Sequence, residues 1–138
     1  MKTVKPSNSY QLSLPDDVRE DIDRTVSSYW VEGRPLLLQL SSYIRTSGEQ
    51  VGAEERLKDR MAKRAQDWTI LETKIRTDSA VDEASAKFTD ADGVTWMHSY
   101  LVWPHLTIYA TIAGPAEQVS DPDNWSVCAL KSIRLTVH

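Results

Sequence analysis

Cysteine is almost absent from this chain of 138 residues. Its single cysteine, Cys128, excludes an intrachain disulfide, and such sparse use of cysteine is typical of proteins kept in a reducing compartment. No apolar run is long enough to span a bilayer or to form the core of a signal peptide. The sequence therefore predicts a cytoplasmic protein without a membrane segment.

Glycine is scarce as well, with five residues, each in an expected turn or near a helix end. The chain has no glycine-rich phosphate loop, no GxSxG nucleophile motif and no HExxH zinc motif. Adjacent carboxylates such as Asp16 and Asp17 lie in an expected loop, whereas a catalytic pair needs two different, protected environments. We expect no enzymatic activity and no cofactor.

Basic residues form no cluster that is free of acidic neighbours. The chain has 16 Lys and Arg against 20 Asp and Glu, a net charge of −4, whereas nucleic-acid binding needs a basic patch to neutralise phosphates. Acidic residues gather in 16–23 and 78–92, which we expect to be solvated loops and strand edges. The sequence predicts a protein partner, no nucleic acid and no membrane, and it leaves a homodimer open.

Hydrophobic periodicity predicts the secondary structure. The expected strands are 9–15, 25–30, 36–45, 69–76, 81–89, 94–103 and 106–113, and the expected helices are 53–68 and 120–135. The order β-β-β-α-β-β-β-β-α predicts an α+β fold, with an antiparallel-dominated sheet of about six to seven strands flanked by two helices. The length fits a single domain over residues 1–138.

Each expected helix carries an apolar stripe that should face the sheet. The first stripe consists of Leu57, Met61, Ala65 and Trp68, and the second of Trp125, Cys128, Ala129, Ser132 and Ile133. Ser120 or Asp121 is expected to cap the second helix, with Pro122 in its first turn. Cys128 should then be an inert core thiol.

Two expected hairpins lie between residues 81 and 114. The motif DADG at 90–93 lacks the later ligands of a calcium loop and predicts a β-turn. With a two-residue turn at Pro104–His105, and two or four residues in the DADG loop, one face is almost wholly apolar and should lie under the helices. Its members would be Ala84, Ala86, Phe88, Met97, Ser99, Leu101, Trp103, Leu106, Ile108, Ala110 and Ile112. A loop of odd length would exchange the two faces of a strand, because side chains alternate with a period of two.

The opposite face mixes aromatic rings with polar groups. Besides Ser85, Val102, Thr107 and Thr111, it is expected to carry a partner-binding surface made of Trp96, His98, Tyr100, Tyr109, Glu83 and Lys87. Tyr and Trp often anchor protein interfaces, which motivates this prediction. The alternative is that a helix covers this face as a second core layer.

Two histidines raise the question of a metal site. His98 is expected in the middle of a strand and His105 at a turn, and zinc would need further ligands that nothing nearby supplies. We predict no metal. An enzyme that uses His98 with Thr111 and Tyr100 stays open as a rival reading.

The order of motifs resembles a known family. A strand ending in LP precedes DRTVSSYW, a hairpin, LLLQLSSYIR, an amphipathic helix, four strands and a closing helix ending in LKSIRL. Over residues 9 to about 135 this pattern is similar to the PsbP-like α/β/α sandwich. That family includes the photosystem II extrinsic protein PsbP, a yeast Ran-binding nuclear import factor of the Mog type, and the bacterial Eag chaperones of type VI secretion effectors. The resemblance is strongest to the bacterial branch; it implies the sandwich fold and a non-enzymatic binding role, and it carries over no functional residue.

The sequence therefore favours a non-enzymatic cytosolic protein-binding or chaperone-like domain, such as a secretion-effector chaperone. A toxin-immunity or inhibitor protein is the alternative, in which the acidic segment 16–23 would steer a basic partner. We expect no thylakoid or periplasmic role, since the chain shows neither a transit region nor a lipoprotein signal.

Overall fold

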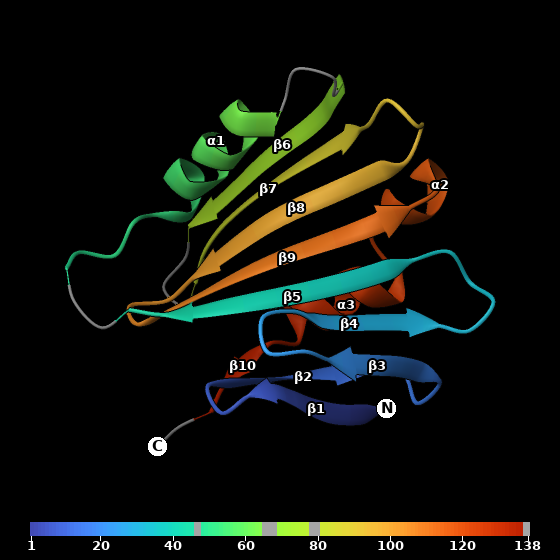
Figure 1. Cartoon of the computed structure of the whole chain (residues 1–138), viewed down its shortest axis with the longest axis horizontal. Helices are drawn as coiled ribbons and strands as arrows, with labels where there is room; N and C mark the ends of the chain where they lie inside the picture. Colours follow the sequence, from blue (N-terminus) through green and yellow to red (C-terminus); the bar gives the residue numbers. More distant parts are fainter. Residues whose placement is uncertain (46–47, 65–68, 78–80, 137–138) are drawn as a thin grey trace.

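The computed structural model describes residues 1–45, 48–64, 69–77 and 81–136 (Figure 1). Its strands are β1 (Lys2–Ser7), β2 (Tyr10–Leu14), β3 (Val18–Ile22), β4 (Ser27–Val31), β5 (Leu37–Ile44), β6 (Thr69–Thr77), β7 (Asp82–Thr89), β8 (Thr95–Val102), β9 (Leu106–Gly114) and β10 (Arg134–Leu135). Its helices are α1 (Ala53–Arg64), α2 (Ala116–Val119) and α3 (Trp125–Lys131).

The described residues form two antiparallel sheets. The larger sheet has seven strands in the order β3-β4-β5-β9-β8-β7-β6, and the smaller has the order β1-β2-β10. All neighbouring strands in both sheets run antiparallel. The fold is therefore α+β, with an antiparallel-dominated sheet flanked by helices, as the periodicity predicts.

Strand β3 is absent from the expected strands, and the acidic segment 16–23 forms this exposed edge strand as well as its flanking turns. Its sequence VREDI has apolar residues only at its ends, and of these only Val18 is buried, so the pattern offers no alternation to detect. β3 is held by its ladder to β4, from the pair Val18–Val31 to the pair Ile22–Ser27. β3 is an edge strand of the large sheet, and its charged side chains discourage pairing with a strand of another chain. The sequence also missed β1, β10 and the short helix α2, whose side chains are mostly exposed or half-buried.

The main core lies between the large sheet and a second layer made of the small sheet, α2 and α3. Alternate residues of β2 point into it: Tyr10, Leu12 and Leu14 are all buried. They belong to one cluster with residues of β4, β5, β8, β9 and the two C-terminal helices, among them Tyr29, Leu38, Leu40, Leu101, Ile108, Ile112, Val119, Ala129 and Leu130. Each large apolar side chain buried here stabilises the fold by about 1.5–3 kcal/mol. Because the cluster contains residues of both sheets, this burial holds the two sheets together.

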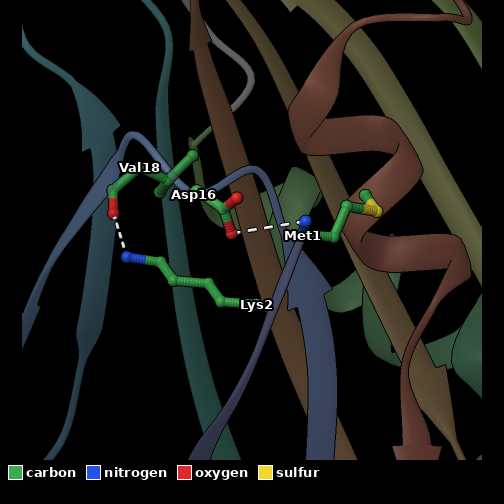
Figure 2. A network of polar contacts seen from close by, with 4 residues as sticks. All are labelled: Met1, Lys2, Asp16 and Val18. Atoms are coloured by element: carbon green, nitrogen blue, oxygen red, sulfur yellow. Dashed lines mark hydrogen bonds and ion pairs between the residues drawn. The ribbon is translucent and has the colours of Figure 1, made fainter.

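The N-terminal residues Met1 and Lys2 contact the chain around the start of β3. Figure 2 shows the Met1 amino group beside the Asp16 carboxylate, at 3.3 Å, and the Lys2 Nζ donating to the Val18 carbonyl oxygen at 2.5 Å. The ion pair is exposed and is worth about 1 kcal/mol at most. These contacts fasten the edge of the small sheet to the edge of the large one.

Helix α1 packs on the other side of the large sheet, against β7 and β8. Its residues Ala53, Leu57 and Met61 form a second, smaller core with the strand residues Ala84, Ala86, Phe88, Tyr100 and Val102. Burial of Leu57 and Met61 confirms that part of the predicted stripe, while Ala65 and Trp68 lie outside the described residues. The two helical layers thus lie on opposite sides of the sheet. Within the described ranges, no helix is long and apolar enough to cross a membrane.

Helix α3 begins later than predicted. The Asp121 side chain closes a turn by accepting from the Asp123 N–H at 2.9 Å, and Asn124 is the N-cap, accepting from the Val127 N–H at 2.8 Å. Pro122 therefore precedes the helix. Trp125, Ala129 and Ile133 contact the main core as predicted, and Ser132 is half-buried.

The expectation of a core position for Cys128 is wrong. Ser126 and Leu130 are the buried neighbours in α3, whereas Cys128 is exposed. The sequence pattern failed here because Ser126 is buried with its hydroxyl donating to the Asn124 side chain at 2.5 Å, and a buried serine cannot be recognised from hydrophobicity.

Cys128 is accordingly expected to react rapidly with a thiol reagent in the native state, because thiol reactivity requires access to solvent. Labelling with an aromatic disulfide should show one fast phase of one equivalent, at a rate near that of the chain in denaturant. A slow phase limited by unfolding would contradict the exposed position.

Candidate functional site

The hairpin of β8 and β9 has the predicted register. Tyr100 pairs with Tyr109 and His98 with Thr111, and the Trp103 N–H donates to the Leu106 carbonyl at 2.8 Å across the Pro104–His105 turn. The side chains of Trp96, His98, Tyr100, Tyr109 and Thr111 therefore share one face of the sheet, because directly opposed residues point to the same side.

Strand β7 has the opposite orientation to the one predicted. Ala84, Ala86 and Phe88 pair with Tyr100, His98 and Trp96, and they share the face of these aromatic residues. Glu83 pairs with Leu101 and Lys87 with Met97. The placement of Glu83 and Lys87 on the predicted binding surface is therefore wrong: both lie on the other face of the sheet.

The loop between β7 and β8 explains this exchange. The Asp90 N–H donates to the Val94 carbonyl at 3.0 Å, which leaves a loop of odd length, Ala91-Asp92-Gly93, in place of two or four residues. Gly93 has φ +81°, a conformation that glycine adopts without strain and that such three-residue hairpin loops require. An odd loop reverses the side-chain alternation of one strand.

Asp90 has a local role in this turn, in keeping with the predicted β-turn. Its carboxylate accepts hydrogen bonds from the Asp92 and Val94 N–H groups at 2.9 and 3.0 Å and from the Trp96 indole Nε1 at 2.9 Å. The hydrogen bond from Trp96, with those from the backbone, lowers the pKa of Asp90 below its usual range. Asp90 therefore positions the Trp96 ring.

Helix α1 divides the aromatic face into a covered part and an open part. Tyr100 and His98 are only 5% and 3% exposed, whereas Trp96 and Tyr109 are half-buried. Tyr100 belongs to the core beneath α1, and Trp96 and Tyr109 lie at its border. The second core layer is thus present over β7 and β8 but ends at β9.

His98 is enclosed by rings and hydrogen-bonded. Its Nδ1 lies 2.8 Å from the Tyr109 hydroxyl, and its ring meets Phe88, Trp96 and Tyr109 edge-on, at centroid distances of 4.8, 5.8 and 5.5 Å. This arrangement orients Tyr109 and fills space. His105 lies exposed at the far turn, and the described residues contain no group of three or more His, Cys, Asp or Glu side chains that could hold a metal ion.

Arg60 of α1 lies at the centre of this face and was not singled out by the sequence. Its Nε donates to the Tyr100 hydroxyl at 2.6 Å, and its guanidinium carbon lies 3.9 Å from the centroid of the Tyr109 ring. Burial lowers the pKa of Arg60, but the hydrogen bond to Tyr100 and the nearby tyrosines raise it more, so its pKa is above the usual value. Among the residues whose side chains the structure describes, no carboxylate forms an ion pair with Arg60. The helical period gave a weak indication of this position, because Arg60 lies next to the Leu57–Met61 stripe and therefore near the sheet.

An open cavity of about 270 Å³ lies beside Arg60. It is lined by Val26, Gln39, Ser41, Arg60, Trp96, His98, Tyr109 and Thr111. A second hollow, of about 300 Å³, adjoins it along α1 and is lined by Arg56, Asp59, Arg60, Lys63 and Tyr100. The site therefore combines aromatic walls, hydroxyl and amide groups, and one fixed cation.

Comparison with solved structures identifies the fold as PsbP-like. The cyanobacterial PsbP protein (CyanoP) of Synechocystis sp. PCC 6803 is similar over 98% of this chain and 92% of its own length, with a TM-score of 0.70 and 10% sequence identity. A protein of Bacteroides thetaiotaomicron VPI-5482 is similar over 94% of this chain and 46% of its own, with a TM-score of 0.60 and 8% identity. No family model and no curated protein sequence matches the chain.

Proposed function

We propose that this protein is a non-enzymatic binding domain that holds a protein partner on the open part of the aromatic face, beside α1. The observation that carries the proposal is the cavity walled by Trp96, Tyr109 and Arg60, on a sheet whose other face packs against the second layer over β4, β5, β8 and β9. Half-exposed aromatic rings next to a cavity are typical anchoring points of protein interfaces.

The open face extends from the cavity over β9, β5 and β4. Along β5, Leu38 and Leu40 are buried in the main core, while Leu37, Gln39 and Ser41 on the other side remain half-buried. Tyr43, further along the same side, is 52% exposed. In Figure 1, α1 lies toward the β6 end of the large sheet, away from β4 and β5, and it packs against β7 and β8. A partner could therefore approach over β5 and reach the cavity without displacing a structural element.

Filling the cavity tests the proposal. Ser41 pairs with Tyr109 and lines the cavity, so Ser41→Tyr should place a ring inside it. We expect Ser41→Tyr to reduce capture of the partner identified in native lysate by about tenfold or more, since interface anchors are commonly worth 2 kcal/mol or more. Its melting temperature should stay close to that of the parent.

A matched control is Thr3→Tyr, which adds a similar group at an exposed position of β1 in the second layer. This variant should retain the partner in full. Equal capture by both variants, or equal loss, would contradict a partner site on the open face.

Two biological roles fit such a domain. A secretion-effector chaperone would hold a segment of its effector on this face, and an immunity or inhibitor protein would block a toxin. The identity of the captured protein, a secretion effector or a toxin, distinguishes the two.

A further inference from the structure

On the basis of the proposed function, we infer that the partner inserts a carboxylate into the cavity, supplied by an acidic side chain of a protein segment, and that Arg60 binds it. Arg60 is the only cationic side chain among those that line this cavity in the described part of the chain. The proposal therefore assigns both the chemical class of the ligand group and the residue that recognises it.

The guanidinium is held in place before any ligand arrives. The hydrogen bond from Nε to the Tyr100 hydroxyl fixes one edge, and the Tyr109 ring lies against one face. Tyr109 is itself held by His98 Nδ1 at 2.8 Å. A preorganised arginine loses little side-chain entropy on binding, and its remaining N–H groups match the two oxygens of a carboxylate.

The charge balance of the site favours an anion. Arg60 is half-buried, and a cation shielded from water is stabilised by an anionic partner. None of the described carboxylates supplies one. Arg56 and Lys63 lie one turn away in the adjoining hollow, where Asp59 offsets one of the two charges. The net charge of the whole chain is −4, so it would repel an acidic segment. Attraction of such a segment therefore depends on the local positive charges of Arg56, Arg60 and Lys63 along α1.

The cavity fits a single carboxylate better than a phosphate. One fixed cation balances one negative charge, whereas a phosphate group carries up to two. Trp96 and Tyr109 offer apolar walls for the methylene groups of a glutamate, and Gln39, Ser41 and Thr111 offer donors for an oxygen that Arg60 does not bind.

Two capped pentapeptides test the inference on the intact chain. One has a central glutamate and the other a central glutamine, with glycine and alanine elsewhere. Nitrogen–proton NMR spectra should show shifts of the Trp96 indole and Arg60 Nε signals on titration with the glutamate peptide. The glutamine peptide should bind about tenfold or more weakly, as expected for the loss of a charged hydrogen-bond partner.

Arg60→Gln should abolish the preference for glutamate. Lys58→Gln is the matched control, because it removes the same charge from α1 at an outward position that is 75% exposed, and it should keep the preference. Equal affinity of the parent protein for both peptides, or a preference that survives in Arg60→Gln, overturns the inference. The first comparison uses only the parent chain, so it holds even if Arg60→Gln fails to fold.

Further measurements distinguish a free carboxylate from an acidic protein segment, and a failure of recognition by Arg60 from a failure of the proposed binding function. If free acetate binds as tightly as the glutamate peptide, the cavity takes a free carboxylate and the assignment to a protein segment is wrong. If Ser41→Tyr loses the captured partner and Arg60→Gln keeps it, the binding function stands and recognition by Arg60 is wrong. If neither variant changes capture, the proposed function itself fails.

Discussion

Tyr100→Ala is expected to lower the free energy of unfolding by about 3–5 kcal/mol, the usual cost of removing a large buried aromatic side chain. Tyr100 is 5% exposed and packs beneath α1 with Leu57, Met61 and Phe88. Removing its ring would leave a cavity, and Arg60 would lose the acceptor of its Nε hydrogen bond. Urea unfolding followed by circular dichroism measures the change.

Tyr100→Phe is the matched control for this variant. It keeps the ring and removes only the hydroxyl, so we expect a loss of about 0.5–1.5 kcal/mol, the net value of a typical hydrogen bond. If Tyr100→Ala unfolds at the same urea concentration as the parent, the ring is not core and α1 does not cover it.

Leu57→Ala is expected to cost about 2–5 kcal/mol, the range for truncating a buried leucine. Leu57 is 3% exposed and lies in the smaller core between α1 and the sheet. The neighbouring Phe88 and Tyr100 are themselves buried, so they fill the space left by the truncation only in part. Chemical denaturation of the purified variant gives the value.

The control for the helix itself is Glu55→Ala, an exposed position two residues earlier in α1. Alanine is the best helix former, so this change should leave stability within about 0.5 kcal/mol of the parent. A loss of that same small size in Leu57→Ala would show that α1 contributes little to the fold.

Local sequence determined much of the aromatic face. A turn at Pro104–His105 fixes the register of β8 against β9, so the sharing of one face by Trp96, His98, Tyr100 and Tyr109 follows from alternation alone. The stripe of Leu57 and Met61 follows in the same way from the helical period. These features depend on residues that are neighbours along the chain, and pattern reasoning detects such neighbours.

The position of β7 marks the limit of local reasoning. DADG indicates a turn, but whether its loop has two, three or four residues depends on how the Asp90 side chain and Gly93 satisfy the hairpin backbone. That difference of one residue removed Glu83 and Lys87 from the predicted surface. Cys128 shows a second limit, because hydrophobicity cannot reveal that Ser126 is buried in α3 while Cys128 is exposed.

Tertiary structure alone decided where the site lies. Nothing local in the sequence shows that α1 packs over β7 and β8 and stops short of β9, so the pattern could not tell a covered aromatic face from an open one. The contact of Arg60 with Tyr100 and Tyr109, 40 and 49 residues further along the chain, is a consequence of that packing. The sequence by itself determined the strands from β4 to β9, the helix α1 and a face rich in tyrosine and tryptophan. The structure determined which of those rings are buried in the core and which cation contacts them. The physical reason is that the position of α1 on the sheet is set by the sum of many long-range contacts, which local sequence patterns do not contain.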